Sequence, residues 1–170
     1  MILRIALVDD QEMYRLGFRM LLETQEEVEV VGEADDGRSA LDLLARVKAD
    51  VVLMDVRMPV LNGIDATARI AQLYPAIRTL VMTTYDQDDY AFGALSAGAS
   101  GFLLKDTRTA QLHQALRAVD SGDAILTPRI TRELLNRHML RPIVTPQQRA
   151  AQQQLGMLSP REREVAELVA

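Results

Sequence analysis

The sequence contains no cysteine, and its only histidines are His113 and His138. A chain without cysteine forms no disulfide and has no thiolate chemistry, which favours the cytoplasm as its compartment. Two histidines without cysteines do not make a zinc site. Magnesium stays possible because it prefers oxygen ligands. These absences favour a cytoplasmic protein whose metal chemistry would depend on carboxylates.

Long hydrophobic runs and a leader sequence are missing as well. No stretch approaches the roughly 20 apolar residues that a membrane helix needs. The first four residues are not followed by the apolar segment and cleavage site of a secretory signal. We therefore expect no membrane partner. A length of 170 residues suggests one ordinary domain with an appendage.

Basic residues are scarce in the front part of the chain. Residues 1–122 contain 19 aspartates and glutamates against 12 lysines and arginines, a net charge of −7. Residues 123–170 contain 5 against 7, a net charge of +2. Because binding to nucleic acid needs a basic surface, the front part is a poor candidate for direct contact with DNA or RNA.

Residues 51–55, Val-Val-Leu-Met-Asp, are the stretch around which the chain is organised. Four apolar residues without alternation indicate a strand buried on both faces, as in a parallel sheet. Asp55 then lies at the carboxyl end of that strand, where open α/β sheets place their reactive groups. A loop containing Pro59 and Asn62-Gly63 follows. Taken alone, Asp55 is either a reactive group or the cap of the next helix.

Apolar runs of this kind recur, and a helical pattern follows each of them. Strands are predicted at residues 2–8, 28–33, 51–55, 77–82 and 101–104. Asp36, Asp86 and Asp106 are the predicted N-caps of the helices that follow the second, fourth and fifth strands. The third helix is expected over about residues 62–74. A strand–helix alternation repeated five times predicts an α/β fold with a parallel sheet covered on both faces.

The chain changes character after these elements. A short helix is predicted within residues 127–138, and residues 141–154 have the composition of a linker, with two prolines and five glutamines. Residues 159–162 form a capping box that opens another helix. The predicted organisation is a domain over 1–122, a linker with a short helix over 123–157, and a helical fragment over 158–170.

Reactive side chains follow four of the five predicted strands. Asp9 and Asp10 follow the first strand, Asp55 ends the third, Thr83 follows the fourth and Lys105 follows the fifth. Because the strands are parallel, we expect all five side chains at one edge of the sheet. Three carboxylates at close range repel one another unless a cation holds them. Mg²⁺, bound by few carboxylates and by water, fits this set best.

The same residue types suit the transfer of a phosphoryl group. Asp55 would be the nucleophile that forms an acyl phosphate. Lys105 and the metal would neutralise the phosphoryl charge, and Thr83 would donate a hydrogen bond. Each residue also has a plainer interpretation, in which Asp9 or Asp10 caps the first helix, Thr83 is a strand-end hydroxyl and Lys105 is solvated. The weaker hypothesis is that all of these plainer interpretations hold together, at matched strand ends.

These motifs, in this order, resemble the receiver domain of two-component response regulators. The resemblance covers residues 1–122 and is specific. It rests on residues 8–10 (Val-Asp-Asp), residues 54–59 (Met-Asp-Val-Arg-Met-Pro) with Asn62-Gly63, Thr83, and residues 98–105 (Gly-Ala-Ser-Gly-Phe-Leu-Leu-Lys). It implies a flavodoxin-like three-layer sandwich with a five-stranded parallel sheet in the order 2-1-3-4-5 and five helices.

The resemblance also implies roles for individual residues. Asp55 would accept phosphate from a histidine kinase, with Lys105 and Thr83 assisting. Asp10 and Asp55 would ligate Mg²⁺ together with the backbone carbonyl of Arg57, and Asp9 would act through water. The family shows no separate cofactor-binding residues. Such a protein is not an enzyme in the ordinary sense, although it assists its own phosphorylation and dephosphorylation.

Thr83 and Phe102 match the hydroxyl and aromatic residues that form the switch of the family. The alternative is that Phe102 is a fixed core residue, since its ring lacks the hydroxyl that many relatives carry. We also expect Arg57, Thr84 and Tyr85 to tune the loss of phosphate, because they follow the nucleophile or the switch threonine.

Many members of the family have proline where this sequence has Asp106. The Leu-Lys-Asp sequence of residues 104–106 resembles the LuxR-type subgroup instead. Residues 158–165 resemble the opening of a LuxR-type helix-turn-helix domain, of which only the first helix is present. The resemblance implies a truncated transcription regulator that binds DNA only through the missing remainder of that domain. It also implies a homodimer on phosphorylation.

Two other functional classes fit the sequence less well. A Mg²⁺-dependent phosphohydrolase with an aspartyl nucleophile usually carries Asp-x-Asp after one strand, whereas Asp9 and Asp10 are adjacent and Arg57 stands two residues after Asp55. A nucleotide- or flavin-binding module needs a glycine-rich first turn. Residues 9–12 are Asp-Asp-Gln-Glu, which argues against this class.

Overall fold

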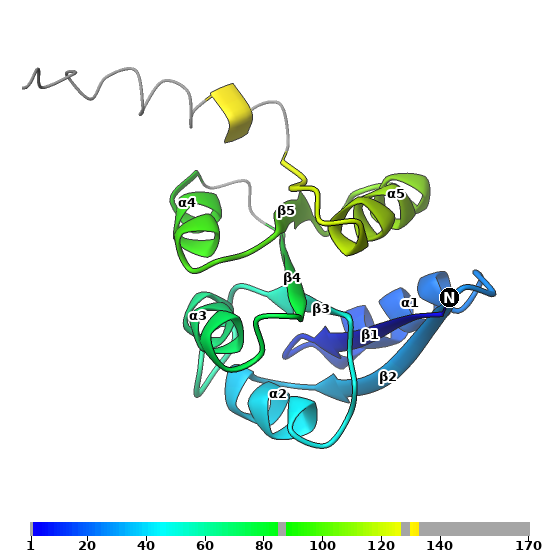
Figure 1. Ribbon diagram of the computed structural model, residues 1–170, viewed down its shortest axis with the longest axis horizontal. Coiled ribbons are helices and arrows are strands. Elements are labelled where there is room, and N and C mark those ends of the chain that lie inside the picture. The colour runs from blue at the N-terminus through cyan, green and yellow to red at the C-terminus, as the bar shows by residue number, and fades with distance from the viewer. Residues whose placement is uncertain (1, 85–87, 127–129, 133–170) are drawn as a thin grey trace, which may run out of the picture. The chain divides into compact units, whose positions relative to one another are not determined.

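A five-stranded parallel sheet forms the centre of the protein, in a computed structural model that describes residues 2–84, 88–126 and 130–132 (Figure 1). The strands are β1 Leu3–Val8, β2 Val28–Ala34, β3 Val51–Asp55, β4 Arg78–Thr83 and β5 Gly101–Leu104. Their order in the sheet is β2-β1-β3-β4-β5, and each neighbouring pair is parallel. The predicted fold class and strand order are therefore confirmed.

Residues 130–132 are helical and lie within the predicted short helix. Among the described residues, five longer helices connect the strands and cover the sheet. They are α1 Glu12–Leu22, α2 Gly37–Leu44, α3 Gly63–Leu73, α4 Asp88–Ser96 and α5 Thr109–Asp120. The buried side chains of α1 and α5 share one apolar cluster with one face of the sheet. Those of α2, α3 and α4 share the cluster on the other face. The sheet therefore has a helical layer on each side, as Figure 1 shows.

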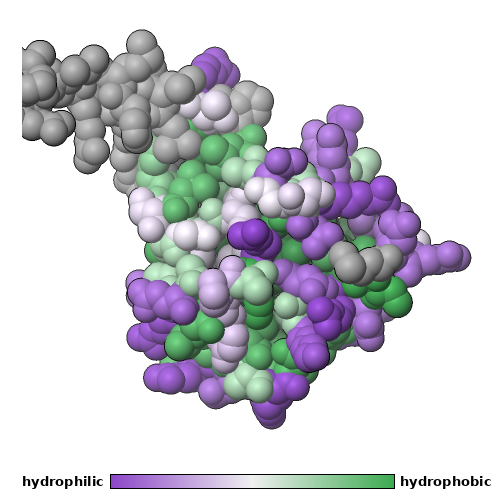
Figure 2. Space-filling model, viewed as in Figure 1, coloured by the Kyte–Doolittle hydropathy of each residue, from purple (hydrophilic) through white to green (hydrophobic). Residues whose placement is uncertain are grey.

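Burial on both faces explains the unbroken apolar runs. All five residues of β3 are buried, and Ile5, Val51 and Leu80 are fully inaccessible to solvent. Each buried aliphatic side chain of this size contributes about 1.5–3 kcal/mol relative to exposure. On the face drawn in Figure 2, hydrophilic and hydrophobic residues are interspersed. No helix among the described residues is long and apolar enough to cross a membrane.

The predicted helix caps had different outcomes. Asp36 caps α2 as predicted, because its carboxylate accepts from the backbone N–H of Arg38 and Ser39. Asp106 was wrongly predicted to cap α5. The chain makes a turn at this point, with the N–H of Thr107 donating to the carbonyl of Leu104, and α5 begins later with Arg108 at its N-cap. Asp86 lies outside the described residues, as does every interpretation of residues 133–170.

Candidate functional site

Asp55 is the last residue of β3, and it does not cap a helix. Its Oδ2 accepts a hydrogen bond from the backbone N–H of Arg57 at 3.0 Å, and only 5% of the residue is exposed. The cap of α3 is Asn62, whose side chain accepts from the N–H of Asp65. The capping interpretation of Asp55 is therefore wrong. The side chain is held at the end of the central strand, among polar groups.

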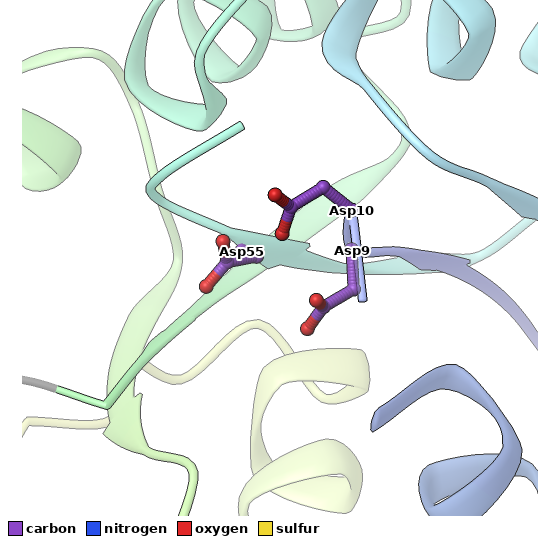
Figure 3. A group of neighbouring side chains, drawn as sticks. All are labelled: Asp9, Asp10 and Asp55. Atoms are coloured by element: carbon purple, nitrogen blue, oxygen red, sulfur yellow. The ribbon is translucent and has the colours of Figure 1, made fainter. Parts of the chain in front are cut away.

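Three carboxylates converge at this edge, as predicted. Asp9 and Asp10 follow β1, which pairs directly with β3. One oxygen of each carboxylate lies within 4.8 Å of the corresponding oxygens of the other two, counting Asp55. Figure 3 shows the three side chains gathered beside the ends of the two strands. Asp9 is buried and Asp10 is exposed, so the cluster opens to solvent on the side of Asp10.

Neither Asp9 nor Asp10 is the N-cap residue of the first helix. The N-cap residue of α1 is Gln11, whose side chain makes no capping hydrogen bond. The carboxylate of Asp9 does accept from the backbone N–H of Gln11 at 3.0 Å. That contact fixes Asp9 at the end of β1, and the other oxygen of Asp9 stays available for Lys105.

Lys105 connects two of the three carboxylates. Its Nζ lies 2.5 Å from Oδ2 of Asp9 and 2.9 Å from Oδ1 of Asp55. Only 3% of the lysine side chain is exposed, so the interpretation of Lys105 as a solvated residue is wrong. The backbone N–H of Lys105 donates to the carbonyl of Thr83, which sets the lysine opposite the end of β4. Asp106 in place of proline leaves this turn without a cis peptide bond.

The electrostatics of the site centre on Asp55. Burial raises the pKa of the Asp55 carboxyl, the hydrogen bond and charge of Lys105 lower it, and the charge of Asp9 raises it again. The net result is a pKa above the ordinary value for aspartate. The effect of burial on the Asp55 carboxyl therefore outweighs the stabilisation of its charged form by Lys105.

The donor set fits a hard divalent cation. All the candidate ligands are carboxylate oxygens, the type that Mg²⁺ prefers. Asp10 is exposed and points into the same space, as expected for a metal that keeps several water molecules. The two aspartates predicted as direct ligands, Asp10 and Asp55, therefore lie in one cluster.

A cavity of about 420 Å³ lies over these groups. It has room for a phosphoryl group and for water. Its lining residues are Asp10, Gln11, Tyr14, Asp55, Arg57, Thr83, Thr84 and Lys105. Gln11 and Tyr14 were missed by the sequence analysis. The available signal was their position at the start of α1, which begins at the edge of the sheet where the aspartates lie. Tyr85 lies outside the described residues.

A second cavity, of about 610 Å³, lies over the β3–α3 loop and α4. Its lining contains Met58, Ile64 and Tyr90 but none of the three clustered aspartates and no lysine. Although this cavity is larger, the chemistry of the site belongs to the one above Asp55.

Thr83 and Phe102 lie on the same face of the sheet. In the register of β4 and β5, Val81 is paired with Phe102, and Thr83 stands two residues after Val81. Thr83 is 1% exposed and lines the Asp55 cavity, whereas Phe102 is fully buried in the cluster shared with α4. The arrangement brings the predicted switch residues onto adjacent strands.

The fold and the site agree with a comparison against known families. A model of the response regulator receiver domain matches residues 5–117. The chain belongs to this family. Its relatives include transcriptional regulatory proteins and a two-component response regulator of the LuxR family.

Three similar proteins illustrate the relationship. The chain is 35% identical to the transcriptional regulatory protein DegU of Brevibacillus brevis over 80% of this chain and 58% of that one. It is 32% identical to the response regulator VraR of Staphylococcus aureus over 100% of this chain and 77% of that one. A crystal structure of a LuxR-family two-component response regulator from Aurantimonas shares 36% identity, with a TM-score of 0.75, and covers 82% of this chain and 99% of that one. The chain thus spans little more than half the length of DegU.

Proposed function

We propose that this receiver domain accepts a phosphoryl group on Asp55 and thereby switches a transcription regulator. The observation that carries the proposal is the buried carboxylate of Asp55 at the end of β3, 2.9 Å from the ammonium of Lys105 and beside two further aspartates. Membership of the receiver family supports the same residue as the phosphoacceptor.

The proposed donor is a phosphorylated histidine of a partner kinase. An oxygen of the Asp55 carboxylate forms a bond to phosphorus while the bond between phosphorus and the imidazole nitrogen breaks. The electron pair of the broken bond stays on the imidazole. In this proposal Lys105, 2.9 Å from Asp55, stabilises the charge on the phosphoryl oxygens, and Thr83, which lines the same cavity, donates a hydrogen bond to one of them. Hydrolysis later returns the carboxylate and releases orthophosphate.

Asp10, Asp55 and the backbone carbonyl of Arg57 are the proposed ligands of Mg²⁺, with Asp9 acting through water. Bound Mg²⁺ would supply positive charge beside the phosphoryl oxygens. The chain's own contribution is to fix the carboxylates. The N–H of Gln11 and the N–H of Arg57 each donate to one of them, and Lys105 holds the remaining oxygens of Asp9 and Asp55.

The proposed switch moves Thr83 towards the phosphoryl group and lets the ring of Phe102 occupy the space that Thr83 leaves. The shared face of β4 and β5 supports this pairing. Structures with and without a phosphoryl mimic are the test. Identical rotamers of Phe102 in both would mean that Phe102 is a fixed core residue.

The proposed output is binding to DNA by a domain that begins at about residue 158, after a linker over 123–157. The relationship to a transcriptional regulatory protein supports this output. The receiver, over residues 1–122, would then control a homodimer that forms on phosphorylation. Light scattering before and after phosphorylation tests the dimer. A gel shift at physiological salt, with this chain beside a version extended by a complete helix-turn-helix, tests the DNA-binding part, and only the extended version is expected to bind specifically.

A phosphodonor assay separates this function from that of a phosphohydrolase. The protein is incubated with phosphoramidate and Mg²⁺ while released orthophosphate and the phosphorylated protein are measured together. A switch accumulates phosphoprotein that persists for minutes or longer. Continuous release of many equivalents of orthophosphate, with little phosphoprotein at any time, would instead favour a hydrolase.

A further inference from the structure

The ring of Tyr14 faces the ammonium group of Lys105. Nζ of the lysine lies 4.1 Å from the centroid of the ring, within the range of a cation–π contact. The same nitrogen contacts Asp9 and Asp55, so an aromatic face and two carboxylates surround the ammonium. Tyr14 also lines the cavity above Asp55. The tyrosine is thus in contact with the ammonium group that bridges Asp9 and Asp55.

Contacts that do not involve Lys105 hold the ring in place. Tyr14 and Phe18, one helical turn apart on α1, are stacked with their centroids 6.4 Å apart and their planes at 22°. Phe18 packs in turn against the apolar cluster beneath α1 and α5. Arg15, in the same turn of the helix, contacts the end of β1, because its Nη1 donates a hydrogen bond to the carbonyl of Asp9 at 2.6 Å. The position of the aromatic ring is therefore supported by contacts other than the one with Lys105.

We infer that Tyr14 is a positioning residue for phosphoryl transfer, acting through Lys105. This inference rests on the proposed phosphorylation of Asp55. Lysine has a flexible chain of four carbons, and its ammonium has only three hydrogen-bond donors. The face of the ring attracts the ammonium, but unlike an oxygen acceptor it does not take up one of the three N–H donors. When Asp55 carries the phosphoryl group, Lys105 can turn from the carboxylate to a phosphoryl oxygen while the ring keeps it over the cavity.

A different role for Tyr14 is to fill space at the start of α1. In that case a leucine, which is apolar and also bulky, would serve as well as an aromatic ring. The cation–π role requires an aromatic face but no hydroxyl, so phenylalanine should replace tyrosine and leucine should not. The comparison of Tyr14→Phe with Tyr14→Leu therefore separates the two roles.

The contact can be observed without any phosphodonor. Lys48 and Lys105 are the only lysines of the sequence, so lysine labelled with ¹³C at the ε-carbon gives two signals. Lys48 is exposed and serves as the reference, and a Lys48→Arg variant assigns the pair. We expect the ring current to shift the ε-protons of Lys105 upfield in the wild type and in Tyr14→Phe. In Tyr14→Leu the shift should disappear. An unchanged Lys105 signal in Tyr14→Leu would overturn the contact.

The role is tested by the rate of phosphorylation with phosphoramidate and Mg²⁺. Loss of the ring in Tyr14→Leu should slow the reaction by about threefold or more, the range expected for one cation–π contact, and Tyr14→Phe should restore most of the rate. Met20→Ala is the matched control, because Met20 is an exposed residue of the same helix. Circular dichroism confirms that each variant is folded.

A double-variant cycle shows whether the ring acts through the lysine. Lys105→Met removes the ammonium, and Tyr14→Leu in that background should cause no further slowing. Equal slowing by Tyr14→Leu in both backgrounds would overturn the inference, as would a wild-type rate in Tyr14→Leu alone. A wild type that takes no phosphate would overturn the proposed function and this role with it. A phosphorylated wild type with an unaffected Tyr14→Leu would overturn this role only.

Discussion

Gly63 approaches the backbone of Asp55 so closely that no other residue fits at its position. A Cβ atom on Gly63 would lie 1.8 Å from the carbonyl oxygen of Asp55. The N–H of Gly63 donates to the carbonyl of Val56 at 3.0 Å. The loop that leaves the site therefore folds back directly onto the strand that carries Asp55, and the first turn of α3 is packed against the end of β3.

Gly63→Ala should consequently destabilise the protein. The backbone of β3 is buried and cannot move away, so the methyl group would displace α3 or the loop at a cost of about 2–4 kcal/mol, near the upper end for single substitutions. Urea unfolding followed by circular dichroism measures the loss. The control is Gly17→Ala in α1, where a Cβ would meet nothing within 4 Å. It should stabilise the protein by about 0.5–1 kcal/mol. Equal stability of the two variants would contradict the close approach.

Val60 has a backbone conformation that a β-branched residue rarely adopts. Its φ is +61°, and the N–H of Leu61 donates to the carbonyl of Pro59 across it at 2.7 Å. The left-handed region costs a residue with a Cβ about 1–2 kcal/mol. Glycine would relieve that strain. Its greater conformational freedom in the unfolded state, however, would lower the free energy of unfolding by about 0.5–1 kcal/mol.

Val60→Gly should therefore stabilise the protein by up to about 1.5 kcal/mol, the largest difference between these two effects. The side chain is 85% exposed, so little packing is lost. Urea unfolding measures the change, and Val60→Ala is the control because alanine keeps the strained Cβ. A Val60→Gly variant less stable than Val60→Ala would refute the strain.

The ion pair of Arg4 with Asp50 should make stability depend on pH. Asp50 accepts from Nε and Nη2 of Arg4 and from its backbone N–H. Hydrogen bonds from Arg4 hold the pKa of Asp50 below its ordinary value. A carboxyl whose pKa is lowered in the folded state stabilises the protein at pH values above its unfolded-state pKa. That contribution is lost as the pH falls through the folded-state pKa.

Asp50→Asn should thus cost about 0.5–1 kcal/mol at pH 7, the range for a partly exposed pair screened by solvent. The difference from wild type should shrink as the pH falls below about 4, where the unfolded aspartate is protonated. Thermal unfolding across this pH series is the measurement. A difference that grows at low pH would mean that the sign of the linkage is wrong.

Removal of Asp10 should weaken the binding of Mg²⁺. Asp10 is the exposed member of the three clustered carboxylates. Mg²⁺ that binds the folded state raises the unfolding temperature, so the rise on adding Mg²⁺ reports its affinity. We expect this rise in the wild type and in Asp42→Ala, whose residue lies exposed on α2, and a much smaller one in Asp10→Ala. An equal rise in all three proteins would place the metal elsewhere.

The sequence was sufficient for the fold and for most of the site. Apolar runs located each strand to within about one residue at most ends, and parallel strands necessarily bring Asp9, Asp55 and Lys105 to one edge. The contact of Tyr14 with Lys105 was not predictable in this way. The contact depends on the angle at which α1 leaves the sheet. The two residues are also far apart in the sequence. No local pattern encodes that angle.

Two other features depended on backbone geometry that residue types do not specify. Asp106 is a good capping residue by type, but the turn that follows β5 delays the helix until after Arg108. The positive φ of Val60 was equally unpredictable from the sequence, because valine is among the residues least expected at a positive φ.

The central claim is that Asp55 alone receives the phosphoryl group. Incubation with phosphoramidate and Mg²⁺, followed by reduction with borohydride and peptide mapping, identifies the modified residue. We expect modification of the wild type at Asp55 only, none in Asp55→Asn, and modification of the Asp42→Ala control at the wild-type level. Full modification of Asp55→Asn, or a modified residue other than Asp55 in the wild type, would contradict it.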